Sequence, residues 1–374
     1  MKVLLAGAFG NLGFEILKVL VERGYDVVAA DLKEKEDNGL EGKYTFKAIN
    51  ATDPETLKGI CDGVDVVITT MGLTSASTVV TAYDVDYQGN LNLYNEAVAA
   101  KVPHFTYISV IACKEPGAEE VPLLHAKAMF EDEVLKGPIP YVIHRPTGYF
   151  YDIAKVFKPY IEKGEMQLLK GYHNVQCNVV DCPDFANYIV DHMLDENAMY
   201  EVGGKETYDY EEITKMCFRA AGKPVIIKDA APWMFTLLGK LPKVKKEGKA
   251  DIMKFGAWTM THSLVGKDVT GDASFKEYIT NYFGGDNECS ISILLTSVMF
   301  GRPSCGPSPL SRPSAASWAS MSSSGSCPLV TASPSCASVC STSSSASPLT
   351  PSRLRASCCP SSSSSTAGAS ADTS

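Results

Sequence analysis

Three glycines spaced three residues apart, followed by an isolated carboxylate, form the pattern with the clearest chemical meaning in this 374-residue chain. Gly7, Gly10 and Gly13 stand in the run GAFGNLG, and Asp31 follows 18 residues after the last of them. In such a turn the first glycine permits a tight bend, the second lets the backbone approach a diphosphate, and the third lets a helix pack on a strand. The N–H groups that begin the helix bind the diphosphate, and the carboxylate accepts hydrogen bonds from ribose hydroxyls. The pattern predicts a dinucleotide site, to which the intervening residues also belong: Phe9, Asn11 and Leu12.

Two charges near the predicted ribose contact bear on which dinucleotide binds. A carboxylate at Asp31 repels a 2′-phosphate, which favours NAD over NADP. Lys33, two residues further on, carries a positive charge that could balance such a phosphate. The sequence thus predicts NAD as the cofactor and leaves NADP open.

The glycine turn needs a strand before it and a helix after it, and the flanking residues supply both. Residues 2–6 are a short apolar run, which is typical of a buried parallel strand. Apolar residues at Ile16, Leu17 and Leu20 share one face of a helix, and the helical pattern ends at Gly24. This strand–turn–helix context strengthens the prediction of a nucleotide site.

Strand-like segments then alternate with helical ones. The predicted strands cover residues 26–30, 44–49, 64–70, 105–110 and 141–144, with helical segments such as 89–100 between them. Repeated units of this length predict a doubly wound parallel α/β sheet, the Rossmann architecture. Ligands of such sheets lie beyond the carboxyl ends of the strands, where Asp31, Asp53 and Gly72 fall. We therefore expect Asp53 and Gly72 to contact the cofactor as well.

The formal net charge of −9 and the pI near 5.3 restrict the class of partner. Nucleic acid or an anionic membrane requires a basic face, so we expect neither, and a small-molecule substrate instead. The N-terminal apolar run is too short for a secretory signal, and no stretch reaches the roughly 18 apolar residues of a membrane helix. A cytoplasmic protein is expected, and the sequence indicates no oligomeric state. Six scattered cysteines lack metal-ligand spacing, so we expect no metal site and reduced, buried thiols: Cys61, Cys113, Cys177, Cys182, Cys217 and Cys289.

The last 85 or so residues differ in kind from the rest. Residues 290–374 contain no Lys, Glu, Asn, Gln, His or Tyr, and the charged residues among them are Arg302, Arg312, Arg353, Arg355 and Asp372. Such a segment lacks the large apolar residues that offset the entropy of ordering, so residues 285–374 are predicted to be a disordered low-complexity tail. Each of the absent amino acids is encoded by codons whose second base is adenine. This pattern suggests a frameshift or gene-model artefact, with a genuine low-complexity tail as the alternative.

Several segments together resemble one known family over residues 1–284. They are GAFGNLG, DVDYQGNLNLYNEA, HFTYISV, HAKAMFEDEVL and HRPTGYFYD, and their order and spacing match the atypical short-chain dehydrogenase/reductases of the NmrA-like, NAD(P)H-binding kind. The resemblance implies an NAD(P)-binding Rossmann domain with a small substrate lobe built mainly from residues 150–284. The aromatic residues of HRPTGYFYD would then either line the substrate pocket or pack the lobe.

The resemblance also implies a catalytic set of Asn, Ser, Tyr and Lys, with the tyrosine four residues before the lysine. Lys127 fits the lysine position, but Leu123 stands where the tyrosine is expected. Asp86 stands at the asparagine position, and Ser109 lies slightly before the usual serine. Lys127 is therefore the one predicted catalytic residue, able to hold the nicotinamide ribose and, as in isoflavone-reductase-like relatives, to donate a proton.

Two functions follow from this incomplete set. The first is an NAD(P)-dependent oxidoreductase that acts on an unknown small molecule, with Lys127 central. The second is a non-catalytic NAD(P)-binding redox sensor or an assembly or accessory subunit, as some NmrA-like relatives and a respiratory complex I subunit suggest. The retained lysine favours the first function, and the missing tyrosine favours the second.

Overall fold

The structure is a computed structural model that describes residues 1–73, 77–231, 233 and 249–284. The segment predicted to be a disordered tail, residues 285–374, lies outside the described residues, and its disorder stays a prediction.

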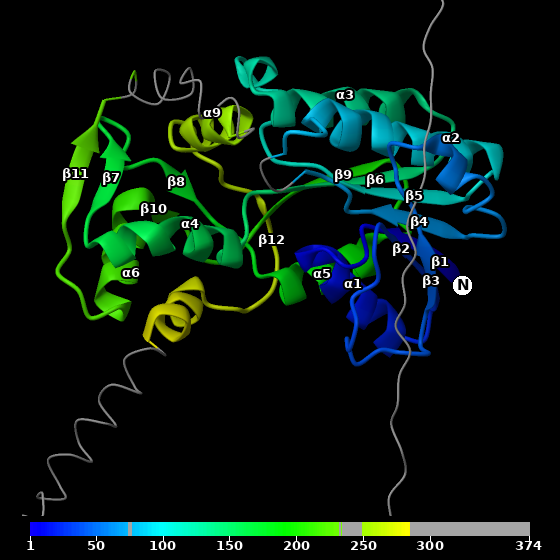
Figure 1. Cartoon of the computed structure of the whole chain (residues 1–374), viewed down its shortest axis with the longest axis horizontal. Helices are drawn as coiled ribbons and strands as arrows, with labels where there is room; N and C mark the ends of the chain where they lie inside the picture. Colours follow the sequence, from blue (N-terminus) through cyan, green and yellow to red (C-terminus); the bar gives the residue numbers. More distant parts are fainter. Residues whose placement is uncertain (74–76, 232, 234–248, 285–374) are drawn as a thin grey trace, which may run out of the picture. The chain divides into compact units, whose positions relative to one another are not determined.

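Eight strands form a sheet in which every neighbouring pair is parallel, in the order β12-β9-β6-β5-β4-β1-β2-β3 (Figure 1). The strands are Lys2–Ala6 (β1), Asp26–Asp31 (β2), Thr45–Ala48 (β3), Val66–Thr69 (β4), His104–Ile108 (β5), Tyr141–Pro146 (β6), Ala198–Gly203 (β9) and Asp268–Val269 (β12). The chain runs outward from β1 through β2 and β3 on one side, and through β4, β5 and β6 on the other. This order confirms the predicted doubly wound sheet and places its topological switch point between β1 and β4.

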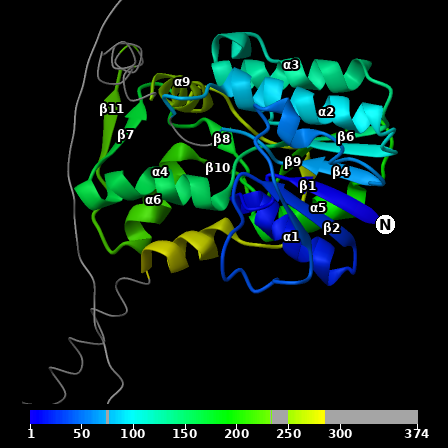
Figure 2. The ribbon, with the colours of Figure 1, turned by 45° about the vertical axis from the view of Figure 1, so that its right-hand side comes forward.

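Helices cover both faces of this sheet. On one face α1 (Asn11–Glu22) packs against α5 (Cys182–His192), and on the other lie α2 (Asn90–Ala99) and α3 (Pro122–Lys136) (Figures 1 and 2). Because successive side chains of a strand point to opposite faces, β1 contributes to two cores. Its four apolar residues after Lys2 are all fully buried, which explains why the strand is a continuous apolar run rather than an alternating one.

A smaller lobe is built from segments that follow β6. Its helices are α4 (Phe150–Lys163), α6 (Tyr210–Ala220) and α9 (Ala250–Thr259), and residues 275–284 are also helical. Its strands pair as β11 with β7 and β10 with β8, and their bounds are Met166–Leu169 (β7), Gln176–Cys177 (β8), Tyr208–Asp209 (β10) and Ile227–Ala230 (β11). A separate core joins these elements, and it includes Phe157, Ile213, Phe218, Trp258, Phe275 and Ile279. Three elements from the same stretch of chain, α5, β9 and β12, belong to the large sheet and its layer.

The predicted helix over 89–100 is α2, but a π-helical segment, η2 (Tyr83–Gly89), precedes it without a break. The side chain of Asn90 donates hydrogen bonds to the carbonyl oxygens of Asp86 (3.0 Å) and Met71 (3.2 Å). An asparagine amide that binds backbone carbonyls competes with regular helical hydrogen bonding, and it ties η2 to the end of β4. Isolated π-helical turns are frequent at functional sites.

Two further expectations from composition can be compared with the structure. Five of the scattered cysteines are free and buried, as predicted, and the sixth, Cys289, lies outside the described residues. Within the described ranges, no helix combines the length and the apolar composition needed to cross a membrane.

Candidate functional site

The glycine turn joins β1 to α1 at the switch point of the sheet. Gly7 has a φ of +79°, and a Cβ atom built on it would lie 2.7 Å from Thr70 Oγ1. A Cβ atom on Gly13 would lie 2.0 Å from the carbonyl oxygen of Gly7, a distance that no side chain tolerates. Gly10 caps α1 without a side chain, so no capping side chain occupies the first N–H groups of the helix. The turn therefore presents a bare helix N-terminus that fits a diphosphate.

Asp31 ends β2 beside this turn. Its carboxylate accepts hydrogen bonds from the backbone N–H groups of Phe9 (2.9 Å) and Leu32 (2.7 Å). These bonds fix the carboxylate against the glycine turn, where it can also accept from the hydroxyls of a ribose. The side chain of Lys33 is 83% exposed, and its ammonium group lies 3.6 Å from the carboxylate of Glu36.

A second lysine lies closer to the turn than the one singled out from the sequence. Lys35 Nζ is 4.3 Å from the centre of the Phe14 ring on α1, a cation–π contact. Lys35 also lines the pocket beside the turn, so it is better placed than Lys33 to meet a phosphate there. The sequence offered no means of choosing between two exposed lysines two residues apart.

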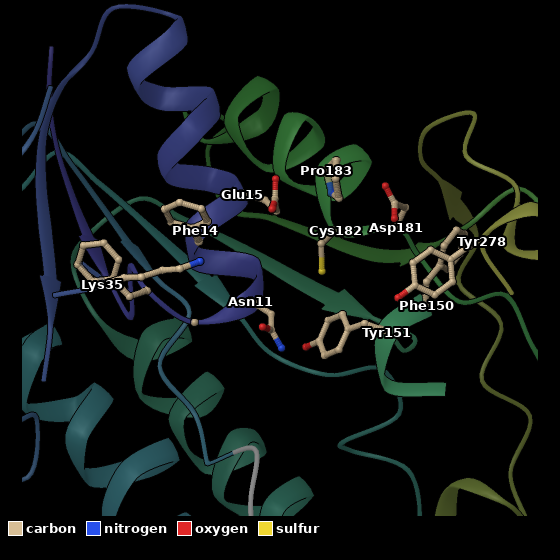
Figure 3. A pocket seen from close by; sticks show the side chains of 12 residues that line it. Asn11, Phe14, Glu15, Lys35, Phe150, Tyr151, Asp181, Cys182, Pro183 and Tyr278 are labelled. Atoms are coloured by element: carbon tan, nitrogen blue, oxygen red, sulfur yellow. The ribbon is translucent and has the colours of Figure 1, made fainter. Parts of the chain in front are cut away.

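A pocket of about 360 Å³ lies between the glycine turn and the lobe. Five of its twelve lining residues are aromatic, and the others include two carboxylates, a lysine and a thiol. The lining residues are Phe9, Gly10, Asn11, Phe14, Glu15, Lys35, Phe150, Tyr151, Asp181, Cys182, Pro183 and Tyr278. Figure 3 shows the side chains of Asn11 and Tyr151 pointing toward each other at the start of α1. Burial raises the pKa of the Cys182 thiol, so this group is protonated and poorly nucleophilic.

The aromatic residues after β6 divide between the two roles left open by the sequence. Tyr151 lines the pocket, and Tyr149 stacks on it at 5.5 Å with 13° between the rings. Phe150 is 4% exposed and packs against Phe275 and Tyr278 of the lobe, although it also reaches the pocket wall. One short segment therefore both anchors the lobe and lines the pocket.

Lys127 lies on the opposite side of β1 from Asp31, above the ends of β4 and β5. Its ammonium group is 3.1 Å from Asp86 Oδ1 and donates a hydrogen bond of 3.3 Å to the carbonyl of Ile108. Asp86 is fully buried and accepts a hydrogen bond of 2.9 Å from the N–H group of Leu73. The side chain of Lys127 is 12% exposed, so most of it is committed to these contacts.

The structure brings Gly72 to the same place. A Cβ atom on Gly72 would lie 2.7 Å from Asp86 Oδ1 and 3.3 Å from Lys127 Nζ. Any larger residue after β4 would force the Asp86 carboxylate to shift, so glycine lets the backbone pass close to this ion pair. The sequence predicted Lys127 and Gly72 as site residues and placed Asp86 at the family's asparagine position, but it did not predict that the three residues meet.

The remaining candidates take other positions. Asp53 is exposed and caps the short helix η1 (Pro54–Leu57) by accepting from the N–H group of Glu55 (3.2 Å), so its cofactor contact stays a prediction. Leu123 packs against the lobe core, and no hydroxyl replaces the absent tyrosine at that position. Ser109 is buried with its Oγ 3.8 Å from Cys113 Sγ.

A buried ion cluster lies next to Lys127, one helical turn further along α3. Glu131 is fully buried and accepts hydrogen bonds from Arg145 Nε (2.9 Å) and Nη2 (2.6 Å) at the end of β6. Lys114 Nζ lies 3.4 Å away. Burial alone would raise the pKa of Glu131, but the hydrogen bonds and charge of Arg145 hold that pKa below its ordinary value. This bidentate pair fixes α3 to the strand that leads into the pocket segment.

Comparison with known proteins gives the same family over most of the chain. The sequence profile of the NmrA-like family matches residues 1–255. The photosystem II assembly factor Ycf39 of Trieres chinensis is 23% identical over 250 residues, which cover 64% of this chain and 76% of that protein. The chloroplastic divinyl chlorophyllide a 8-vinyl-reductase of Arabidopsis thaliana is 24% identical over 274 residues, covering 66% of this chain and only 60% of the reductase.

Solved structures share the fold at lower sequence identity. The NADPH-dependent quinone oxidoreductase QOR2 of Escherichia coli, crystallised with NADPH, superposes with a TM-score of 0.59 at 17% identity, covering 76% of this chain and all of the other. The triphenylmethane reductase of Citrobacter sp. gives a TM-score of 0.59 at 17% identity, covering 76% and 99% of the two chains.

Proposed function

This chain belongs to the NmrA-like family, and we propose that it is an NAD(P)-dependent oxidoreductase that acts on a small organic molecule. The observation that carries the proposal is the arrangement of Lys127, Asp86 and Gly72 at the same edge of the sheet as the glycine turn. The reductases among its relatives and structural neighbours support the same reaction class.

The order of the strands supports a placement for each half of the dinucleotide. Asp31 ends β2 on one side of β1, whereas Lys127 and Gly72 lie at the ends of β4 and β5 on the other. With the diphosphate on the start of α1 and the adenosine ribose at Asp31, the nicotinamide half extends toward β4 and β5. Lys127 is then the residue that meets it.

The chemistry divides between cofactor and chain. A bound nicotinamide supplies or accepts the hydride. Lys127 would hold the ribose hydroxyls on the nicotinamide side and would place its ammonium group where a substrate oxygen could accept a proton. Because Leu123 replaces the tyrosine, the proton delivered to the substrate comes from Lys127 or from water.

Cofactor choice tests the role of Asp31. We expect the wild-type chain to bind NADH more tightly than NADPH, because the fixed carboxylate repels a 2′-phosphate. Asp31→Asn keeps an acceptor for the Phe9 N–H group but removes the charge. The ratio Kd(NADPH)/Kd(NADH) should therefore fall roughly tenfold. Calorimetric titration with both nucleotides measures this change.

The matched control is Asp26→Asn, which removes an exposed carboxylate at the opposite end of the same strand. It should leave both affinities as in the wild type. A wild-type chain that prefers NADPH would show that Lys35 or another group outweighs Asp31.

Catalysis by Lys127 predicts a loss of turnover. Among quinones, enones and other carbonyl compounds screened by oxidation of NADH, a substrate found for the wild type should be turned over at least about 100-fold more slowly by Lys127→Met. Lys136→Met, on the same helix with its side chain 71% exposed, serves as the control and should keep full turnover. Unchanged turnover in Lys127→Met would remove this lysine from the catalytic machinery.

A second candidate function is a non-catalytic dinucleotide-binding protein that senses redox state or assists assembly. Leu123 in place of the tyrosine favours it, as does the similarity to photosystem II assembly factors. In that case the chain binds NAD(H) in titrations but turns over none of the compounds in the screen.

A further inference from the structure

The ion pair under the nicotinamide half of the proposed site differs from what the family resemblance implies. An asparagine, which is neutral, is expected where Asp86 stands. Here a fully buried carboxylate lies 3.1 Å from the ammonium group of Lys127. Among the described residues, Asp86 is the carboxylate with which Lys127 forms an ion pair.

The structure holds Asp86 firmly. Its second carboxylate oxygen accepts from the N–H group of Leu73 at 2.9 Å, and the side chain of Asn90 binds its backbone carbonyl at 3.0 Å. Asp86 has no exposed surface, and the absence of a side chain at Gly72 lets Oδ1 lie close to the backbone after β4. Asp86 therefore places a carboxylate at a defined position beside the ammonium group of Lys127.

A charge at this place acts differently on the two forms of the cofactor. The nicotinamide ring carries one positive charge when oxidised and none when reduced. An uncompensated ammonium group nearby would therefore weaken binding of NAD⁺ and leave binding of NADH almost unchanged. A buried carboxylate beside that ammonium group cancels the difference.

We propose that Asp86 is a positioning residue that neutralises Lys127 and thereby sets the ratio of the affinities of the protein for NAD⁺ and NADH. This inference rests on the proposed dinucleotide site and goes beyond it, because it concerns which redox form of the cofactor the protein holds. It applies equally to an enzyme and to a redox sensor.

The test measures the dissociation constants of NAD⁺ and NADH by calorimetry for the full chain and three variants. Asp86→Asn leaves Lys127 uncompensated and should raise the ratio Kd(NAD⁺)/Kd(NADH) roughly tenfold. Lys127→Met leaves the buried carboxylate uncompensated and should shift the same ratio in the opposite direction. The double variant Asp86→Asn/Lys127→Met restores neutrality, and its ratio should return to near the wild-type value.

The opposite signs distinguish charge from damage, because a loosened site would weaken both nucleotides in every variant. Asp26→Asn, at the amino-terminal end of β2, controls for the change in net charge and should leave the ratio unaltered. If Asp86→Asn does not fold, Lys127→Met and the double variant still give the sign of the effect.

The outcomes separate the two proposals. If the wild type binds neither nucleotide, the proposed dinucleotide site is wrong. If it binds both, and the single variants leave the ratio unchanged or move it in the same direction, the dinucleotide site stands and the role assigned to Asp86 is wrong.

Discussion

Replacing Glu131 with alanine is expected to lower the free energy of unfolding by about 3 to 5 kcal/mol. Glu131 is fully buried, and both of its oxygens are bound by the guanidinium group of Arg145, whose side chain is only 14% exposed. Removing the carboxylate leaves a largely buried cation whose other acidic neighbour is the half-exposed Glu201, 3.8 Å from Nη1, and it frees α3 from the end of β6. Equilibrium unfolding in urea measures the loss.

Two variants make this experiment specific. Glu133→Ala removes a carboxylate from the same helix, but Glu133 is 39% exposed and pairs loosely with Lys136 at 3.6 Å, so the change should stay within about 0.5 kcal/mol. The double variant Glu131→Ala/Arg145→Met should be less destabilised than the sum of its parts, because it no longer buries an unpaired charge. If Glu131→Ala has the same unfolding free energy as Glu133→Ala, the Arg145 guanidinium group is solvated by water in the variant and the loss of its partner does not destabilise the fold.

Stability is expected to fall steeply as the pH drops below about 6.5, and His144 is the main cause. His144 lies in β6 with no exposed surface, and among the described residues neither of its ring nitrogens has a hydrogen-bond partner. The rings of Phe185, Tyr188 and Tyr200 surround it at 5.5 to 5.9 Å. Burial, with a smaller contribution from the charge of His192, lowers the pKa of His144 to about 3.

The sign follows from which state binds the proton. Between pH 6.5 and 3 the unfolded chain binds a proton at this histidine and the folded chain does not, so acid favours unfolding. The stability present at neutral pH is lost as the pH falls through this window, at up to about 1.4 kcal/mol per pH unit. His144→Leu removes the titrating group and fits the apolar surroundings, so its unfolding free energy should fall less steeply with acid.

Denaturant unfolding of both proteins at a series of pH values from 8 to 4 tests this prediction. All other titrating groups are common to the two chains, so the difference between the curves isolates His144. At neutral pH the variant should be at least as stable as the wild type, since it buries no unpaired ring nitrogens. Parallel curves across the acid range would show that His144 finds a partner or water in solution.

The sequence by itself determined the fold and one half of the candidate site. The strands at β1, β2 and β6, the helix after the glycine turn and the position of Asp31 at a strand end were all predictable. Each depends on residues close together in the chain: a run of apolar side chains, a 3.6-residue period, or glycines in a tight turn. Such signals persist whatever lies elsewhere in the molecule.

The other half of the site was decided by the tertiary structure. Lys127 and Asp86 are 41 residues apart and meet only because α3 and η2 pack on the same end of the sheet. The same holds for Glu131 with Arg145, and for His144, whose isolation among aromatic rings no local pattern reveals. Which helix face packs on which strand end is set by the summed packing of the whole core. The partner of a buried charge is therefore fixed by the fold rather than by the residues beside it in the sequence.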